Sequence, residues 1–236
     1  MRLRLAVLLG LLLTALSSHA PAQSDGGSEA ARERVLTQMD TAAKEFHSLQ
    51  AAFVWDQKTL KPIEDEDISK GTIYFQRDSK QIKMLADITD PAPKTVRFAD
   101  GEVDVYTPKT DQLIPYKTGK HQAEVESFLV LGFGGRGHDL ANTYDVKYLG
   151  EEKVDGGVQT SKLELVPKSE NARNQFARIV LWIDPQRGIS VQQQLFQPDG
   201  NYRLAKYSNI VINQKLPDGV FKLKTTSKTT ILSPQG

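Results

Sequence analysis

The chain contains no cysteine among its 236 residues, and this absence sets the first limits on what it can be. Without cysteine it can form no disulfide, although an exported protein would be permitted them. It also cannot carry the lipid that bacterial lipoproteins attach to a cysteine after their signal is cleaved. Its stability has to come from a hydrophobic core, for which the chain is long enough.

Long hydrophobic runs are also missing, apart from one at the N-terminus. Arg2 and Arg4 precede an apolar stretch, and Ala20-Pro21-Ala22 provides a small-x-small cleavage site. This pattern is typical of a removable export signal over residues 1–22, and its apolar part is too short for a membrane anchor. We therefore expect the mature protein, residues 23–236, to be free in the periplasm or secreted.

Charge of one sign is not in excess. Removal of residues 1–22 leaves 28 of the 30 basic residues against 29 acidic ones, a formal net charge of −1. The composition therefore predicts no nucleic-acid partner. No linker-like composition divides residues 23–236, so we predict a single domain over that range.

Motifs for metal binding and catalysis are scarce. The histidines left after signal removal, His47, His121 and His138, stand in no H-x-H or H-E-x-x-H spacing. No G-x-S-x-G sequence marks a nucleophilic serine, and the acidic residues of 61–70 are predicted to share one solvated loop. We predict no metal, no cofactor and no enzymatic activity.

One stretch, Gly132-Phe133-Gly134-Gly135-Arg136-Gly137, formally satisfies the dinucleotide-binding pattern G-x-G-x-x-G. That pattern binds a pyrophosphate only where a strand precedes it and a helix opens from it within a βαβ unit. The neighbouring sequence here predicts antiparallel hairpins instead. We interpret the glycines as hinge or turn residues of a flexible lid segment.

Two segments have helical periodicity. Apolar residues at three- and four-residue spacing predict an amphipathic helix over about 29–48, packed on a sheet: Val35, Met39, Ala42, Ala43, Phe46 and Leu49. A second, shorter helix is predicted over 122–131 and ends at Gly132. Val125, Phe128 and Leu129 share one of its faces.

Most of the remaining sequence alternates with the period of a β-strand, beginning with Ala51, Phe53 and Trp55 on one face. Further strands are predicted at about 71–77, 81–88, 95–99, 102–107, 111–116, 143–149, 158–166, 177–184, 189–197, 202–213 and 220–231. Several are joined by tight turns such as Asp100-Gly101 and Pro198-Asp199-Gly200, which make neighbours antiparallel. The pattern predicts a mainly β protein with a few helices, as a strongly curved sheet or a barrel.

A series of stretches in one order resembles the periplasmic outer-membrane lipoprotein carrier (LolA-like) family. The matching stretches are Gly71-Thr72-Ile73-Tyr74-Phe75-Gln76-Arg77, Asp90-Pro91, Phe98-Ala99-Asp100-Gly101 through Thr107-Pro108, Leu163 to Lys168, Ile179 to Asp184, and Leu216 to Phe221. The resemblance implies an incomplete, half-open antiparallel β-barrel of about eleven strands, whose apolar concave side is covered by a helical lid.

The same resemblance implies a function without covalent chemistry. Members of the family accept acylated lipoproteins from an inner-membrane ABC lipoprotein-releasing transporter, shield their acyl chains, and pass them to an outer-membrane lipoprotein receptor. Such a carrier has a physical purpose, because exposing one long acyl chain to water costs on the order of 10 kcal/mol. We expect this chain to act in the same way, as a monomer.

Site residues follow from strand parity and from the resemblance. Ile73, Phe75 and Arg77 share a face of their strand, and family members carry at the matching position an arginine that holds the lid. Asp78 stands where the family usually has proline, and it can pair with Arg77. The acyl-chain cavity is predicted to be lined by Phe53, Trp55, Ile73, Phe75, Met84, Phe98, Val125, Phe128, Leu129 and Trp182.

Two other functions stay open at this point. A lipid-sensing regulatory module on the same fold would bind a signalling partner and exchange no cargo. A hydrolase would turn over ester or glycosidic substrates and depend on one histidine or acid. For Arg77, the alternative to a lid latch is a side chain that extends from the strand end into solvent.

Overall fold

The computed structural model describes residues 25–60, 62–78 and 81–234. The export signal predicted over 1–22 lies outside these residues. The described chain contains the helices α1 (Asp25–Glu45), α2 (Gln122–Leu129), α3 (Gly137–Thr143) and α4 (Glu170–Arg173). Its strands are β1 (Ser48–Thr59), β2 (Asp65–Arg77), β3 (Ile82–Asp90), β4 (Lys94–Ala99), β5 (Glu102–Thr107), β6 (Gln112–Lys117), β7 (Tyr144–Lys153), β8 (Gln159–Pro167), β9 (Arg178–Asp184), β10 (Ile189–Phe196), β11 (Tyr202–Ile212) and β12 (Thr230–Ile231).

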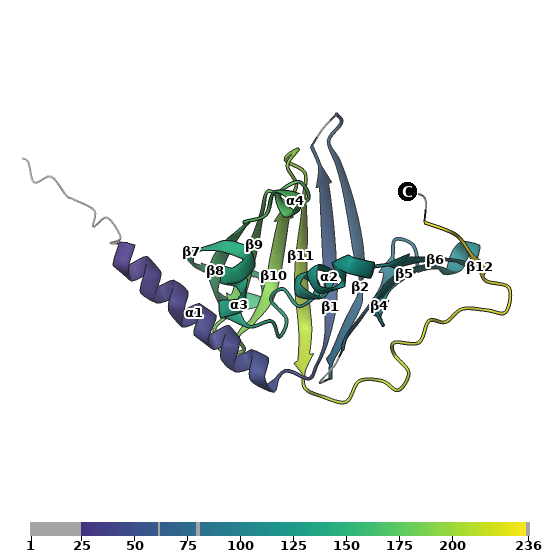
Figure 1. Ribbon diagram of the computed structural model, residues 1–236, viewed down its shortest axis with the longest axis horizontal. Helices are drawn as coiled ribbons and strands as arrows, with labels where there is room; N and C mark the ends of the chain where they lie inside the picture. The colour runs from purple at the N-terminus through teal and green to yellow at the C-terminus, as the bar shows by residue number, and fades with distance from the viewer. Residues whose placement is uncertain (1–24, 61, 79–80, 235–236) are drawn as a thin grey trace, which may run out of the picture.

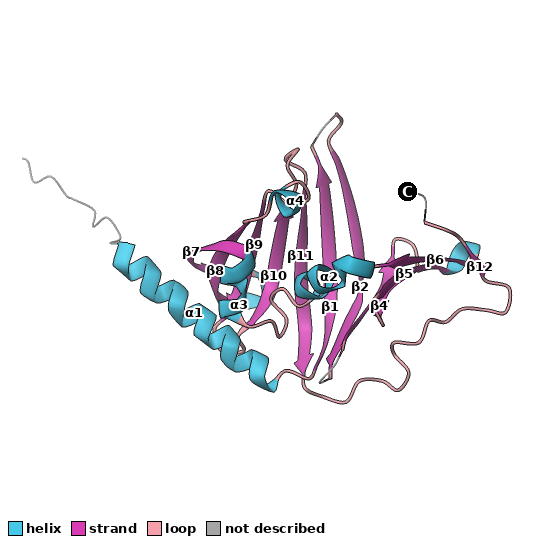
Figure 2. Ribbon diagram, in the orientation of Figure 1, coloured by secondary structure: helices cyan, strands magenta, loops and turns pink. Residues whose placement is uncertain are grey.

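All twelve strands belong to one sheet, in the order β12-β6-β5-β4-β3-β2-β1-β11-β10-β9-β8-β7. Neighbouring strands are antiparallel except for the short β12, which runs parallel to β6. The sheet curves but does not close, because its edges, β7 and β12, do not pair with each other. Helices α1, α2 and α3 lie on one side of it (Figures 1 and 2). The expected half-open barrel with a helical lid is confirmed.

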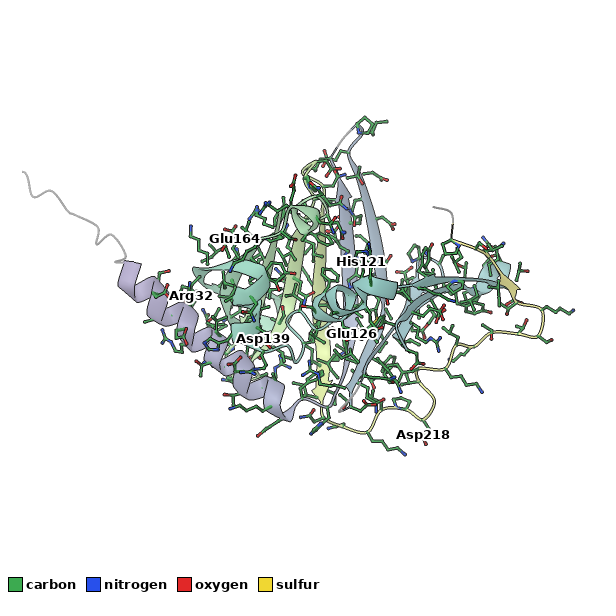
Figure 3. The ribbon with its side chains drawn as sticks, viewed as in Figure 1. Arg32, His121, Glu126, Asp139, Glu164 and Asp218 are labelled. Carbon is green, nitrogen blue, oxygen red and sulfur yellow. The ribbon has the colours of Figure 1, made fainter. Side chains whose placement is uncertain are left out.

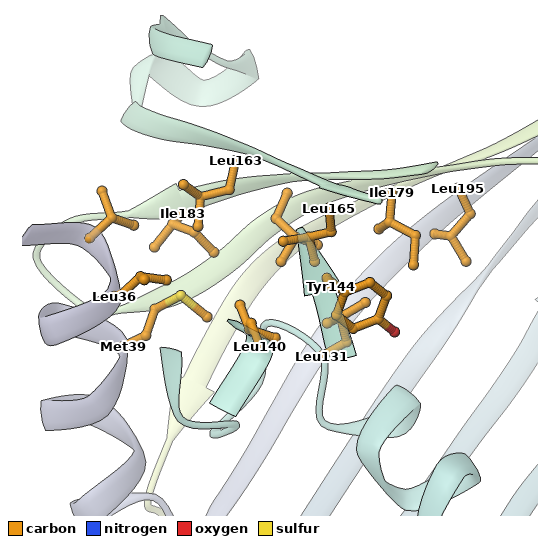
Figure 4. Packing of buried hydrophobic residues seen from close by; sticks show 12 residues of the cluster. Leu36, Met39, Leu131, Leu140, Tyr144, Leu163, Leu165, Ile179, Ile183 and Leu195 are labelled. Carbon is orange, nitrogen blue, oxygen red and sulfur yellow. The ribbon is translucent and has the colours of Figure 1, made fainter. Parts of the chain in front are cut away.

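Alternation along the strands decides which residues form the core. Leu49, Ala51 and Phe53 of β1 are buried on the concave face. The next residue, Val54, points to the convex face and is exposed. Under α1 the concave side is filled by aliphatic residues of β8 and β9, with Leu36 and Met39 of the helix packed on them (Figure 4). Each fully buried leucine or isoleucine contributes about 1.5–3 kcal/mol relative to exposure.

Helix α1 ends earlier than its periodicity predicts. It stops at Glu45, and Leu49 belongs to β1. Leu49 is fully buried, so its position fits the apolar stripe of the helix as well as the inward face of the strand.

None of the helices in residues 25–60, 62–78 and 81–234 is long and apolar enough to cross a membrane.

Two predictions about strands are wrong. The acidic stretch predicted as a loop over 61–70 contains the first part of β2, which pairs with β1 as far out as Asp65 opposite Thr59. This end of the hairpin has no core to cover, so charged side chains are tolerated on both of its faces. The strand predicted over 220–231 is reduced to β12, because lysines and threonines there offer no apolar face to bury.

The rest of the C-terminal segment is held by side chains instead of by a β ladder. The carboxylate of Asp111, just before β6, accepts hydrogen bonds of 2.6 Å from the hydroxyls of both Thr226 and Thr229. Tyr106 of β5 donates a third bond to the same carboxylate at 3.0 Å. These bonds lower the pKa of Asp111 and fix the segment beside the sheet edge.

Candidate functional site

The concave face beneath α2 is a continuous apolar surface built from β1 to β4. Five residues predicted to line a cavity are buried together in it: Phe53, Ile73, Phe75, Met84 and Phe98. Three more pack against this cluster while staying partly exposed, namely Trp55 from β1 and Val125 and Leu129 from α2. Strand alternation and the shared face of α2 thus bring eight of the ten predicted residues into one packed cluster under the lid.

The other two predicted residues lie elsewhere. Phe128 points toward the neighbouring cluster under α1 and stacks on Phe176 with ring centroids 5.3 Å apart. Trp182 is on the convex face, where it is buried with Val180 and Val191. The prediction that Trp182 lines the cavity is therefore wrong. Strand β9 is buried on both faces, so its pattern of apolar residues does not indicate which face is concave.

The lid consists of α2, α3 and the linker between them, residues 130–136, which contains the glycine-rich run. No sequence pattern predicted α3, which begins at Gly137 within that run. Close packing explains the glycine, since a Cβ at Gly137 would lie 2.3 Å from the carbonyl oxygen of Leu36 in α1. The glycine thus allows α3 to rest directly on α1.

Phe133 in the linker is the residue that the sequence reasoning missed. Its side chain is only 2% exposed and sits inside the concave cluster. The ring lies 5.3 Å from that of Phe75 and meets Tyr207 of β11 edge-on at 4.7 Å, measured between centroids. An aromatic residue inside a glycine-rich run was the available signal, because such a run gives a bulky side chain no local reason to be present.

Three backbone carbonyls of the linker are bound by the sheet. Gln193 of β10 donates from its side-chain amide to the carbonyl of Leu131 at 2.6 Å. The backbone N–H of Ser190 donates to the carbonyl of Gly132 at 2.7 Å. Arg77 donates from Nη1 to the carbonyl of Gly134 at 2.6 Å. The linker is therefore fastened on both sides of Phe133, by β10 and by β2.

Arg77 stands at the end of the apolar row formed by Ile73 and Phe75. Its guanidinium also lies 5.7 Å from the centroid of the Phe46 ring, within the range of a cation–π contact. Partial burial lowers the pKa of Arg77 from its ordinary value. The following residue, Asp78, accepts a hydrogen bond of 2.8 Å from the backbone N–H of Gln81 across the turn to β3.

A pocket of about 420 Å³ opens between the two lid helices. Arg77 of β2, Ile82 of β3 and Tyr144 of β7 line it from the sheet. Glu126 on α2 and Asp139 on α3 line it from the lid (Figure 3). Its volume falls within the range of about 300–1,000 Å³ that is usual for small-molecule sites.

Helix α3 is tied to α1 through His138. Its ring nitrogens Nδ1 and Nε2 lie 2.6 Å from Asp40 and 2.7 Å from Glu33, both on α1. Its backbone N–H also donates to Asp40 at 3.2 Å. The hydrogen bonds to Glu33 and Asp40 raise the pKa of His138, since they favour its charged form. Burial raises the pKa of Asp40, but the bonds from His138 outweigh it and lower the net value.

These features define a class of protein: an open antiparallel half-barrel whose apolar concave face is closed by a short helical lid. The family model described as outer membrane lipoprotein carrier protein LolA matches residues 44–224. The chain belongs to this family. Among curated proteins, none matches it.

Several solved structures share the fold. MucB aligns with a TM-score of 0.53 and 17% identity, covering 84% of this chain and 64% of MucB. An uncharacterized conserved protein from Thermus thermophilus also reaches 0.53, with 12% identity, and 87% of this chain and 98% of that chain are covered. A chain of the Pseudomonas aeruginosa MucA/MucB complex aligns at 0.50 with 17% identity, covering 82% of this chain and 61% of that one. At these identities the likeness concerns the fold, and this chain spans about 64% of the length of MucB.

Proposed function

We propose that this protein is a periplasmic carrier that shields the acyl chains of lipoproteins on its concave face beneath the lid. One observation carries the proposal: an aromatic side chain of the lid, Phe133, occupies an otherwise continuous apolar surface of the sheet. A hydrocarbon chain that takes its place buries the same surface. At about 0.8 kcal/mol per methylene, a long chain offsets the cost of moving the lid.

In this proposal the lid is closed when no cargo is bound and opens by releasing a small number of polar contacts. Arg77 is the latch, since its bond to Gly134 joins β2 to the linker. The residues that contact the acyl chains are those of the concave cluster, and Phe133 is added to them. The mature protein, 23–236, acts as one carrier domain and catalyses no reaction.

The proposed partners follow from the carriage of lipoproteins. Cargo comes from an inner-membrane ABC lipoprotein-releasing transporter and goes to an outer-membrane lipoprotein receptor. Since the net charge of the mature chain is near zero, local surfaces must guide docking to either partner.

A second function is favoured by the solved relatives. One of the solved structures with this fold is the Pseudomonas aeruginosa MucA/MucB complex, so a protein of this fold can bind a protein partner. On this reading the chain is a regulatory module, and a lipid beneath the lid changes its affinity for a signalling protein.

Native mass spectrometry of the protein isolated from the periplasm separates the two functions. Carriage predicts complexes whose added mass equals an acylated lipoprotein and that disappear when a receptor-bearing membrane is supplied. A regulatory module predicts a complex with one non-acylated protein and no transfer of lipoprotein to membranes. A protein that isolates without either kind of mass contradicts both.

A further inference from the structure

The end of the β1–β2 hairpin stands beyond the rest of the sheet (Figure 1). The two strands pair with each other out to Thr59 opposite Asp65, whereas β2 pairs with β3 only from Lys70 onward. Within the described chain, the outer edge of residues 65–69 therefore has no strand beside it. The side chains from Asp65 to Ile68 are exposed, so this part of the hairpin contributes nothing to the core.

The hairpin end is nevertheless held in a fixed position. The backbone N–H of Leu60 donates to the side chain of Asn201, in the turn between β10 and β11, at 2.7 Å. Lys58 and Glu66 form an ion pair of 2.6 Å across the two strands. Both contacts brace the tip, which lowers the entropy that a partner must remove when it binds.

Three large apolar side chains are exposed at this end. Ile63 is 78% exposed, more than any other large apolar residue that the structure describes, and Leu60 and Ile68 are exposed by 43% and 42%. Single apolar residues scattered over a surface need no explanation. Three of them on one projecting and braced element indicate a contact surface.

Four consecutive carboxylates, Glu64 to Asp67, stand between Ile63 and Ile68, and one of them, Glu66, pairs with Lys58. Charges on a free strand edge commonly serve to prevent pairing with other chains. That role explains the carboxylates, but it does not explain why isoleucines protrude on either side of them. Apolar side chains that protrude on both sides of an acidic stretch favour a partner with an apolar pocket and basic residues around it.

We propose that the hairpin end, Leu60 together with residues 62–68, is a docking element that inserts Ile63 into an apolar pocket of a partner protein whose rim carries lysine and arginine. The charge decides between a protein and a lipid surface, because anionic lipids repel this tip while a basic protein rim attracts it. The inference goes beyond the carriage of acyl chains and does not depend on it.

Photo-crosslinking in the cells that make the protein tests the proposal first. A benzophenone amino acid replaces Ile63 in one variant and Ile231 in a control, since Ile231 is 68% exposed but lies on β12 at the sheet edge. We expect position 63 to crosslink one protein that position 231 does not. Crosslinks that are the same at both positions, or none at position 63, overturn the proposal.

The captured protein is then purified and its affinity measured with unmodified carrier, Ile63→Ser and the double variant Asp65→Lys, Asp67→Lys. We expect Ile63→Ser to weaken binding at least tenfold. The double variant should also bind more weakly than the unmodified carrier, and this loss of affinity should be larger at low salt than at high salt. Leu149→Ser, on β7 and 40% exposed, serves as the control and should bind normally.

A flotation assay tests the membrane as the alternative partner. Vesicles of phosphatidylcholine with about one third phosphatidylglycerol should leave the unmodified protein in solution. Flotation of the unmodified protein together with loss of flotation in Ile63→Ser would overturn the proposal. So would a captured partner whose affinity is unchanged by both sets of substitutions. Equal melting temperatures for all variants establish that each one is folded.

Discussion

The guanidinium of Arg77 lies 2.6 Å from the carbonyl oxygen of Gly134, and this bond joins the sheet to the lid. Replacing Arg77 with leucine removes the bond and leaves the carbonyl without this donor. Because the guanidinium is half exposed, its loss should favour the open lid by only about 1 kcal/mol. We expect Arg77→Leu to bind a triacylated lipopeptide about fivefold more tightly and to release it more slowly to membranes.

Arg178→Leu is the matched control for the latch. Arg178 lies on the convex side, where it pairs with Glu164 at 3.1 Å and covers the ring of Phe196. Its loss should leave both the affinity for the lipopeptide and its release unchanged. Equal binding and release in Arg77→Leu and in the unmodified protein would refute the latch.

A methyl group at Gly134 should disturb the closed lid. This residue has a φ of +73°, and a Cβ placed on it would lie 2.4 Å from the ring of Phe46. Gly156 has a similar φ of +81° but has no atom within 4 Å of the same position. Gly156→Ala should therefore report only the backbone cost, about 1–2 kcal/mol. Gly134→Ala should lower the free energy of unfolding by more, as measured in urea.

Two results would contradict this reading of the linker. One is an equal loss of stability in the two alanine variants, which would mean that the contact with Phe46 costs nothing. The other is a Gly134→Ala protein whose linker amides exchange hydrogen as slowly as in the unmodified chain.

The attachment of α3 to α1 should depend on pH through His138. The folded-state pKa of His138 lies above its ordinary value of 6.5, so its contribution to stability is complete below that pH and is lost as the pH rises through the raised pKa. The folded-state pKa of Asp40 lies below its ordinary value of 3.8, so its contribution is lost as the pH falls through the lowered pKa. The contact between α3 and α1 should therefore contribute most to stability between the ordinary pKa of Asp40, 3.8, and that of His138, 6.5.

Urea unfolding at pH 6 and at pH 8.5 measures this dependence. The unmodified protein should lose more stability between the two pH values than His138→Gln does, because the variant has no imidazolium between Glu33 and Asp40. Arg136 is the other charged group that acts on Asp40, and it is present in every variant compared. His47→Gln is the control and should behave like the unmodified protein. Identical pH dependence in all three would exclude the ion pairs as the cause.

Phe133→Ala should separate the lid from the rest of the fold. Removing a buried phenylalanine from a packed cluster costs about 3–5 kcal/mol where the site cannot collapse. In the proposed carrier the lid opens without unfolding the sheet, so we expect most of this cost in the local exchange of linker amides and less of it in global unfolding. Binding of a single-chain amphiphile such as lysophosphatidylcholine should become tighter, because its chain no longer displaces the ring. Weaker binding would show that Phe133 holds the ligand.

The face of each strand could be predicted where one side is polar. Phe53, Ile73 and Phe75 alternate with neighbours that are at least partly exposed, and all three lie in the concave cluster. The same rule fails at Trp182, since β9 buries both its faces and alternation carries no information there. Tertiary position relative to the lid, which no local pattern contains, decides that residue.

The lid was predicted in outline and not in detail. The helix over 122–131 and the glycines after it follow from periodicity and composition, and α2 confirms the helix. The insertion of Phe133 and the bond from His138 to α1 depend on contacts with residues far away in the sequence. The acidic residues of β2 show a further limit, because a hairpin without a core needs no alternation and resembles a loop.

The central claim is that hydrocarbon chains lie on the concave face, and the two tryptophans of the chain can test it directly. Trp55 belongs to the concave cluster and Trp182 to the convex one. Variants Trp182→Phe and Trp55→Phe each keep one indole, and brominated acyl chains quench indole fluorescence only on close contact. The account predicts that a lipopeptide with brominated chains quenches Trp55 and leaves Trp182 bright. Quenching of Trp182 alone, or of neither residue when the lipopeptide is bound, would contradict it.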